Sequence, residues 1–259
     1  MSRVISIANQ KGGVGKTTTA QNLGYALAAY YHKRVLLIDL DPQGNLSDSF
    51  GISDFQENIM SALDGMCKLH DVIHQIDEYL FIVPANVELA TAEISFVARM
   101  GRENLLKKQI SDVIDDFDYI FIDCSPSLGL LTVNAFTASD YILVPVQAEY
   151  HSLTGLKLIF DSMMQVKENI NEKLELFGLI ITFFDSRKTL NKDVQEELKK
   201  QFPHLVFDTC IRDNVALAEA PSQGQTIFEY RGKSYGSDDY KALAGEFINR
   251  MELKHAPRK

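Results

Sequence analysis

The chain has 259 residues, of which 46% are hydrophobic and 24% are charged, and its formal net charge is −9 at pH 7. No stretch approaches the roughly 18–20 consecutive apolar residues of a membrane-spanning helix, and an acidic protein is not drawn to nucleic acid as a whole. This length, without a linker-like segment, indicates one domain over residues 1–259.

Charge is unevenly distributed along the chain. Residues 1–130 carry 10 basic and 17 acidic side chains, a balance of −7, whereas residues 187–259 carry 13 basic and 11 acidic side chains, a balance of +2. Binding of a polyanion to this acidic chain would therefore need a local basic surface, and we expect that surface in the C-terminal third of the chain.

The N-terminus and the cysteines indicate the cellular compartment. The first ten residues lead into a strand pattern and lack the features of a signal peptide. Cys67, Cys124 and Cys210 are odd in number and widely spaced, which fits neither a disulfide framework nor a metal site. We expect a cytoplasmic protein with reduced thiols.

Short, continuously apolar runs alternate with amphipathic segments. The runs predict strands at residues 4–8, 35–39, 80–84, 119–123, 141–146 and 177–183, and the amphipathic segments predict helices at 17–31, 102–115, 153–169, 190–202 and 240–253. This alternation predicts an α/β fold with a mostly parallel, twisted sheet and helices on both faces. Ligands of such sheets bind at the carboxyl ends of the strands.

A glycine-rich segment lies between the first predicted strand and the first predicted helix, the context of a phosphate-binding P-loop. Glycines let successive N–H groups turn toward phosphate oxygens, and the positive helix end adds to the attraction. Lys16 is expected to contact the β- and γ-phosphates, and the Thr17 hydroxyl to bind Mg²⁺. The predicted ATP-binding residues are Lys11, Gly12, Gly13, Val14, Gly15, Lys16, Thr17 and Thr18.

The motif departs from the strict P-loop pattern at its start. Its first glycine would stand at position 10, where this chain has Gln10, and the variant begins with Lys11 instead. A second lysine is useful where negative charge develops at the γ-phosphate, so we expect Lys11 and Lys16 to be catalytic.

Three aspartates lie at the ends of predicted strands. Asp39 and Asp41 share one face of their strand, so that one can hold a Mg²⁺-bound water and the other can orient the attacking water. Asp123 ends an apolar strand, as in the second P-loop signature, and is expected to contact Mg²⁺ through water. The predicted metal residues are therefore Thr17, Asp39 and Asp123, and Asp41 is a predicted catalytic residue. The loop at 124–129 is expected to respond to the γ-phosphate.

Five segments together resemble the ParA/Soj family of partition ATPases, at residues 8–19, 39–45, 119–132, 146–150 and 219–224. The similarity extends from residue 3 to about residue 250. The first segment alone is shared with MinD and the nitrogenase iron protein, whereas Asn9-Gln10 and the Asp-Pro-Gln-Gly sequence after Leu40 are typical of the ParA/Soj branch.

The resemblance implies an ATP-dependent homodimer in which Lys11 reaches the nucleotide of the partner subunit and Asp41 supports hydrolysis. It implies non-specific DNA binding by the ATP-bound dimer on the nucleoid, and a ParB/Spo0J-like activator that stimulates hydrolysis. The cargo would be a chromosome or a plasmid. The short N-terminus resembles the family's short form, so we expect no operator-reading helix-turn-helix.

The resemblance also concerns DNA-binding cations. Arg187 matches a DNA-binding arginine of the family, and Lys188 and Arg212 are expected to contribute. At two positions where relatives have arginine this chain has Asp213 and Ala216, which would weaken phosphate contacts. The other interpretation is that these cations are ordinary solvated surface charges.

Two further functions stay open. A MinD-like positioning ATPase would use the segment at 240–253 and the basic tail at 254–259 as a membrane anchor. We expect instead a last helix packed on the core, and no membrane partner. A metabolic ligase or reductase is the other alternative. A reductase would need cysteines that bridge a cluster, and Cys124 follows a metal-binding strand end too closely.

Overall fold

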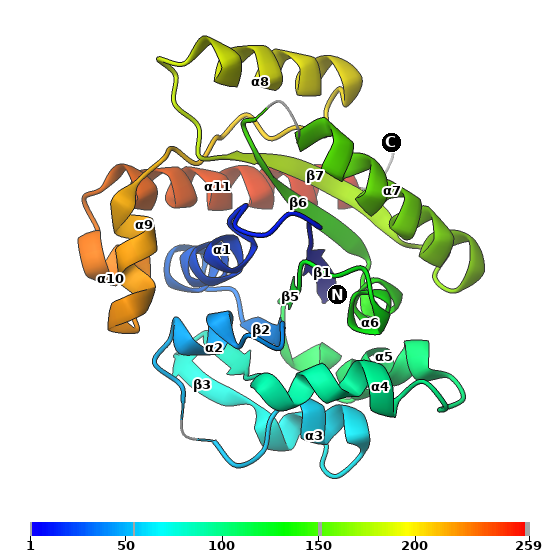
Figure 1. Cartoon of the computed structure of the whole chain (residues 1–259). Helices are drawn as coiled ribbons and strands as arrows, with labels where there is room; N and C mark the ends of the chain where they lie inside the picture. The colour runs from blue at the N-terminus through cyan, green and yellow to red at the C-terminus, as the bar shows by residue number, and fades with distance from the viewer. Residues whose placement is uncertain (1, 54, 150–151, 257–259) are drawn as a thin grey trace.

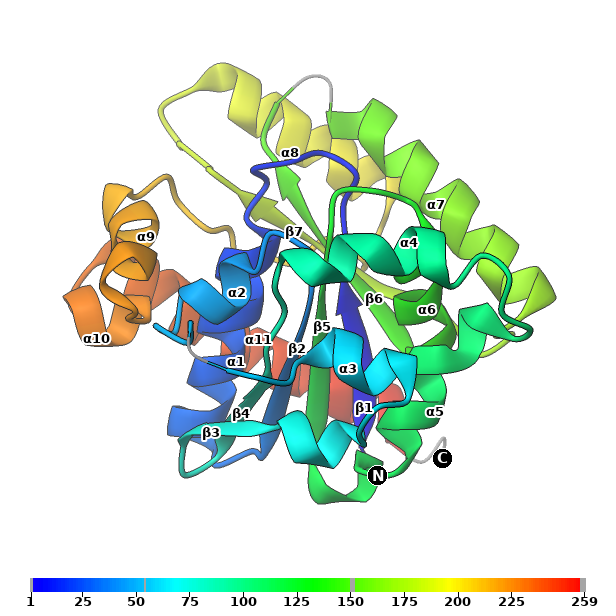
Figure 2. The same ribbon diagram turned by 60° about the horizontal axis from the view of Figure 1, so that its bottom comes forward.

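The structure of the chain is a computed structural model that describes residues 2–53, 55–149 and 152–256. Its strands form one twisted sheet with helices on both faces (Figures 1 and 2). Within the described ranges the strands are β1 (Arg3–Ile7), β2 (Val35–Leu40), β3 (His74–Asp77), β4 (Leu80–Val83), β5 (Tyr119–Cys124), β6 (Tyr141–Gln147) and β7 (Glu175–Thr182).

The helices connect these strands. Those in the described residues are α1 (Lys16–Tyr31), α2 (Asn45–Asp48), α3 (Ile59–Asp64), α4 (Ala92–Ser95), α5 (Leu105–Ser111), α6 (Leu130–Ala138), α7 (Ser152–Asn169), α8 (Thr189–Gln201), α9 (Val215–Glu219), α10 (Ile227–Arg231) and α11 (Tyr235–His255). Short 3₁₀ helices lie at Leu69–Val72, Val87–Thr91, Arg102–Asn104, Ile114–Asp116 and Ala220–Gln223.

The strand order is β3-β4-β2-β5-β1-β6-β7, and every pair is parallel except β3 and β4. The predicted α/β fold with a mostly parallel sheet is thereby confirmed. Parallel pairing brings the carboxyl ends of β1, β2 and β5 to one edge of the sheet, and the loop after β1 lies there with α2 and α8 (Figure 2).

Alternate residues of the central strands point to opposite faces of the sheet and contribute side chains to two separate hydrophobic layers. In β2, Leu36 and Ile38 belong to the layer that contains side chains of α3, α5, α6 and α7, whereas Val35 and Leu37 belong to the layer that contains side chains of α1 and α11. Figure 1 shows these two groups of helices on opposite sides of the sheet. Because both faces of the central strands are buried, their sequences are continuously apolar, which is why the sequence predicted them so closely.

Two predicted helices differ from the observed ones. The helix expected at 102–115 is interrupted, because only α5 is α-helical and 3₁₀ turns flank it. Asp112, Asp115 and Asp116 follow α5. Their negative charges would lie at the negative end of the helix dipole, which is unfavourable, so the α-helix does not continue through them. The last helix begins at Tyr235, five residues before the expected start, with the Ser234 side chain accepting a hydrogen bond from Ser237 N–H.

The apolar side chains of the last helix pack inward. Leu243, Phe247, Ile248 and Met251 are all buried in the layer that includes α1. Residues 257–259 of the expected basic tail, and residue 150 of one family-like segment, lie outside the described residues. Among the residues that the structure describes, no helix has both the length and the apolar character needed to cross a bilayer.

A segment beyond α8 pairs with the outer side of β7, the last strand of the sheet. Leu179 N–H donates to the carbonyl of Leu205 at 2.9 Å, and Phe207 N–H donates to the carbonyl of Leu179 at 2.8 Å. Further along, Ile211 N–H donates to the carbonyl of Ile181 at 2.8 Å. This pairing carries the chain from the outer sheet edge back toward the loop after β1.

Candidate functional site

The loop between β1 and α1 has the backbone conformation of a phosphate-binding loop. Gly13 and Gly15 have φ angles of 72° and 87°, a left-handed region that side chains disfavour. The loop is fixed from β7, because the Thr182 hydroxyl donates to the carbonyl of Val14 at 2.9 Å. Helix α1 starts at Lys16, so its positive end faces the concave side of the loop.

A cavity of about 530 Å³ opens in front of this loop. Its lining combines the predicted residues Gly12, Gly13, Gly15, Lys16, Thr17, Thr18 and Asp41 with Gln21, Gln43, Asn45, Asp48, Ser49, Pro126, Phe183 and Pro221. Val14, the remaining glycine-loop residue, is buried on the protein side. The structure therefore brings residues from five separate parts of the chain around one opening.

Lys16 projects into this cavity while remaining mostly buried. Its ammonium lies 3.3 Å from the carbonyl oxygen of Lys11, across the loop. Burial lowers the pKa of Lys16, and the nearby carboxylates Asp123 and Asp41 oppose that shift. A lysine held in such surroundings is a strong counter-charge for an anion that enters the cavity.

Asp123 is fully buried and incompletely satisfied. Its Oδ2 accepts a hydrogen bond from the Thr17 hydroxyl at 2.7 Å, whereas its Oδ1 has no hydrogen-bond partner. Burial, and then the neighbouring charge of Asp39, raise the pKa of Asp123. A buried carboxylate oxygen without a donor, beside a hydroxyl, is the arrangement that a hard cation with oxygen ligands would complete.

Asp39 and Asp41 take different positions. Asp39 pairs in register with Asp123 across β2 and β5 and is fully buried, which raises its pKa to about 6. Its Oδ2 accepts from both the backbone and the hydroxyl of Ser47, at 2.9 and 2.7 Å, and its Oδ1 accepts from Asp41 N–H at 3.2 Å. Asp41 lines the cavity. Asp39 therefore fixes the segment that carries Asp41, and its predicted contact with a metal stays a prediction.

Lys11 points away from Lys16. Its ammonium donates to Gln147 Oε1 at 2.9 Å and to Glu149 Oε2 at 2.6 Å, both at the carboxyl end of β6 in the same subunit. The backbone N–H of Lys11 donates to Asn9 Oδ1 at 3.0 Å. The two predicted catalytic lysines thus lie on the same loop but face different directions.

Two of the predicted DNA-binding cations lie at the start of α8. The Arg187 guanidinium is exposed and pairs with Asp185 through two bonds of 2.9 Å. These bonds lower the pKa of Asp185 to about 2. Lys188 is exposed at the residue before α8. Both cations are accessible to a ligand in solution.

Arg212 is more strongly engaged. It donates to both carboxylate oxygens of Asp239, with a shortest distance of 2.6 Å, and its guanidinium lies 4.2 Å from the ring centre of Tyr235. Its charge is therefore largely offset within the protein. Nearby, Ala216, at one of the two positions where the resemblance leads us to expect arginine, is buried.

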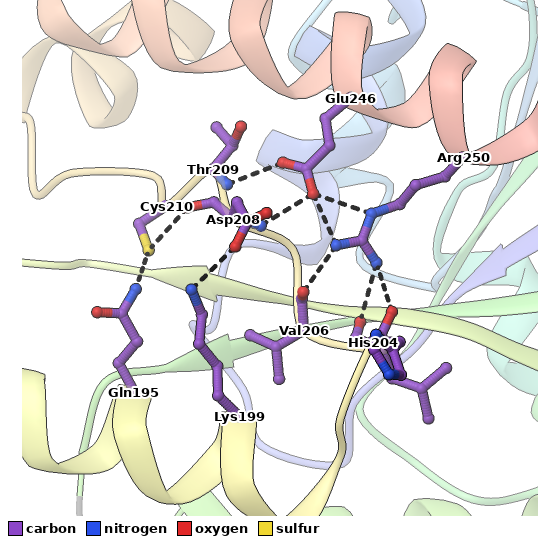
Figure 3. A network of polar contacts seen from close by, with 10 residues as sticks. Gln195, Lys199, His204, Val206, Asp208, Thr209, Cys210, Glu246 and Arg250 are labelled. Atoms are coloured by element: carbon purple, nitrogen blue, oxygen red, sulfur yellow. Dashed lines mark hydrogen bonds and ion pairs between the residues drawn. The ribbon is translucent and has the colours of Figure 1, made fainter.

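A polar network fixes the segment between α8 and α9 (Figure 3). Glu246 accepts the backbone N–H groups of Asp208 and Thr209 at 2.9 and 2.8 Å. Arg250 pairs with Glu246 and donates to the carbonyl of Val206 at 2.7 Å. Helix α11 thus positions the strand-like segment that leads to Arg212.

A second cavity, of about 240 Å³, adjoins the first. Both are lined by Gly15, Thr18 and Phe183, and the second extends over the segment 211–218 to Tyr240. Phe183 has a φ angle of 52°, which is unusual for a bulky residue and costs roughly 1–2 kcal/mol. Backbone strain of this kind is concentrated at functional sites, so Phe183 is a candidate contact for a ligand in either cavity.

Sequence reasoning missed several of these residues. Phe183 follows β7 and Pro221 lies in the turn after α9, so neither is near the P-loop in sequence. Gln21 had a local signal, because it lies one helical turn after Thr17 on α1. Its side-chain amide donates to the carbonyls of Ser49 and Gln225, at 2.7 and 3.2 Å, and ties two walls of the cavity together.

Comparison with known proteins agrees with this geometry. A family model described as "AAA domain" matches residues 2–176. The chain is 45% identical over 249 residues to the sporulation initiation inhibitor protein Soj of Bacillus subtilis (strain 168), with 95% of this chain and 98% of that protein covered. It is 41% identical to the chromosome partitioning protein ParA of Myxococcus xanthus (strain DK1622), with 100% and 92% covered.

A solved structure is also similar throughout. Cobyrinic acid a,c-diamide synthase from Mycobacterium smegmatis, with bound ADP and magnesium, superposes with a TM-score of 0.86 at 34% identity, covering 99% of this chain and 97% of that one. The identity to the partition proteins is higher, at 41–45% over at least 95% of this chain. On this similarity the chain belongs to the ParA/Soj family of partition proteins.

Proposed function

We propose that this chain is a slow ATPase of chromosome or plasmid partition, which binds Mg·ATP in the cavity in front of the loop at 11–18. Two subunits associate around ATP, the dimer binds DNA non-specifically, and a ParB/Spo0J-like partner stimulates hydrolysis and resets the cycle. The protein is then cytoplasmic and on the nucleoid while ATP is bound. The observation that carries the proposal is that the buried Lys16 and Asp41 line one cavity, with the buried Asp123 hydrogen-bonded to Thr17 of the same lining.

Magnesium fits the oxygen atoms at the base of this cavity. The Thr17 hydroxyl would hold the ion directly, and Asp123, with its unpaired Oδ1, would hold it through water, with Asp39 behind. The ion would neutralise phosphate charge in a site that already contains three carboxylates. A similar protein was solved with ADP and magnesium, which supports this assignment.

The nucleoside has a natural place in the second cavity. That cavity adjoins the phosphate loop through Gly15 and Thr18, and Phe183 offers an aromatic surface to a base. The polar network of Figure 3 fixes the backbone of residues 206–209, directly before the segment that lines this cavity from Ile211. Adenine recognition would therefore depend on the C-terminal third of the chain.

Two alternatives are less well supported. A membrane-bound MinD-like function would need an apolar face on the last helix, and the apolar residues of α11 are buried against the sheet. A metabolic ligase is suggested by the name of the solved structure, whose 34% identity is below the 45% and 41% of the partition relatives. Sedimentation with lipid vesicles in the presence of ATP tests the first alternative.

The Lys16→Ala variant tests the nucleotide site. Loss of a buried, paired positive charge weakens ATP binding by roughly 30-fold or more, because the phosphates lose their main counter-charge. Calorimetric titration with ATP and Mg²⁺ measures the change. Unchanged affinity in a folded Lys16→Ala protein would show that the phosphates bind elsewhere.

The Asp41→Ala variant separates binding from hydrolysis. Asp41 lines the cavity and is proposed to orient the attacking water, so its loss lowers the hydrolysis rate by roughly 100-fold while dimerisation with ATP persists. Phosphate release and sedimentation velocity measure the two properties on one sample. A variant that stays monomeric with ATP would mean that Asp41 has a structural role.

The Asp123→Asn variant tests whether the buried carboxylate serves a cation. Removing a buried negative charge beside Asp39 raises the unfolding midpoint of the nucleotide-free protein by roughly 2–4 °C, the shift that about 1 kcal/mol produces in a large domain. The same variant gains less stability from Mg·ATP than the wild type. Asp112→Asn, at an exposed residue after α5, is the matched control. A lower midpoint would indicate a purely structural carboxylate.

DNA retention across a salt series tests the DNA-binding step. We expect retention with ATP and none with ADP, and we expect Arg187→Ala and Lys188→Ala each to reduce the salt slope by about one. Lys68→Ala is the control, because Lys68 is an exposed cation near the opposite edge of the sheet. Equal retention with both nucleotides, or equal slopes for all variants, would contradict the proposal.

A further inference from the structure

Lys11 makes a contact within its own subunit that conflicts with a role in another subunit. Its ammonium is bound by Gln147 and Glu149, at 2.9 and 2.6 Å, and the contact with Glu149 is an ion pair. A lysine that must reach the partner's nucleotide has to leave both groups first. The loop after β6 therefore competes with a phosphate for the same ammonium.

Both ends of this contact are held by rigid parts of the fold. On one side, Asn9 is buried, donates to the carbonyl of Pro145 at 2.7 Å and accepts the backbone N–H of Lys11 at 3.0 Å. On the other side, Ala148 donates its backbone N–H to Thr182 and accepts a 2.7 Å hydrogen bond from the buried Asn191 side chain. Glu149 thus follows a fixed backbone and presents its carboxylate to Lys11.

We propose that Glu149 is a positioning residue that holds Lys11 within its own subunit while no partner is bound. Breaking the Lys11–Glu149 ion pair is then part of the free energy needed to form the ATP-bound dimer. The inference rests on the proposed function, in which two subunits associate around ATP, and on the expectation from the family resemblance that Lys11 then reaches the partner's nucleotide. A triphosphate carries more negative charge than one carboxylate, so it displaces Glu149 when a second subunit presents it. A subunit with no such partner keeps the resting contact.

The strength of the contact suits a reversible restraint. The side chains of Lys11 and Glu149 are 39% and 48% exposed, so solvent weakens their attraction. An exposed ion pair of this kind changes an equilibrium by roughly 1.4- to 5-fold. Each dimer breaks two such pairs, so removing both should lower the dimer dissociation constant by roughly 2- to 30-fold.

The test compares dimer dissociation constants by sedimentation equilibrium with Mg²⁺ and a non-hydrolysable ATP analogue. Glu149→Gln removes the charge and keeps the shape, and it should dimerise roughly 2- to 30-fold more tightly than the wild type. Glu149→Asp keeps the charge on a shorter side chain, and its dimer dissociation constant should lie between those of the wild type and Glu149→Gln. Glu172→Gln makes the same change at an exposed residue before β7, far from the P-loop, and should match the wild type.

Salt separates an electrostatic restraint from a general structural effect. The dimer dissociation constant of the wild type divided by that of Glu149→Gln should fall toward one as the salt concentration rises, because screening weakens the ion pair, which only the wild type has. A ratio of one at low salt, or weaker dimerisation of Glu149→Gln, would overturn the inference. So would a tighter Glu149→Gln dimer whose ratio to wild type does not change with salt.

The Lys11→Ala variant distinguishes failure of this inference from failure of the proposed function. If Lys11→Ala dimerises as tightly as the wild type, Lys11 does not act across the interface, and the role that the family resemblance implies for it in the proposed dimer is wrong. If Lys11→Ala loses dimerisation while Glu149→Gln equals the wild type, the proposed function stands and only the restraint by Glu149 is rejected.

Discussion

The burial of two carboxylates side by side is the constraint on which the rest of the site depends. Asp39 and Asp123 stand in register on adjacent parallel strands, so their charges cannot move apart without a change in the sheet. Lys16 and the donors from Ser47 and Thr17 offset part of this repulsion. One oxygen, Asp123 Oδ1, keeps no hydrogen-bond partner, so the negative charge at this point of the sheet is not fully compensated by the protein itself.

The sequence predicted the central strands and the phosphate loop because both depend on local chemistry. Strands buried on both faces must be continuously apolar, and a loop that curls around an anion needs glycine at Gly13 and Gly15. The remaining parts of the site depend on tertiary structure. Phe183 and Pro221 reach the cavity only because the chain returns from the outer sheet edge, and the pairing of Arg212 with Asp239 joins segments 27 residues apart. The hydrophobic periodicity of the sequence reports local secondary structure and cannot reveal contacts between distant segments.

The nucleotide loop and the proposed DNA-binding segment share their supports. Asn191 donates to the backbone after β6 and accepts the N–H of Asp185, which in turn pairs with Arg187. On the other side of the same backbone, Glu149 holds Lys11. A change at the phosphate loop therefore has a short, bonded route to an exposed cation. Such a route supports the proposal that nucleotide state and DNA affinity change together.

The chain segment paired with the outer side of β7 has a consequence for solubility. An uncovered parallel edge would present free N–H and carbonyl groups to strands of other molecules, a known cause of aggregation. Here the backbone of Leu205, Phe207 and Ile211 occupies those groups along β7. At the other border, β3 is short and its pairing is irregular. The pairing along β7 and the short, irregular β3 therefore leave little free backbone at either border of the sheet for edge-to-edge association between molecules.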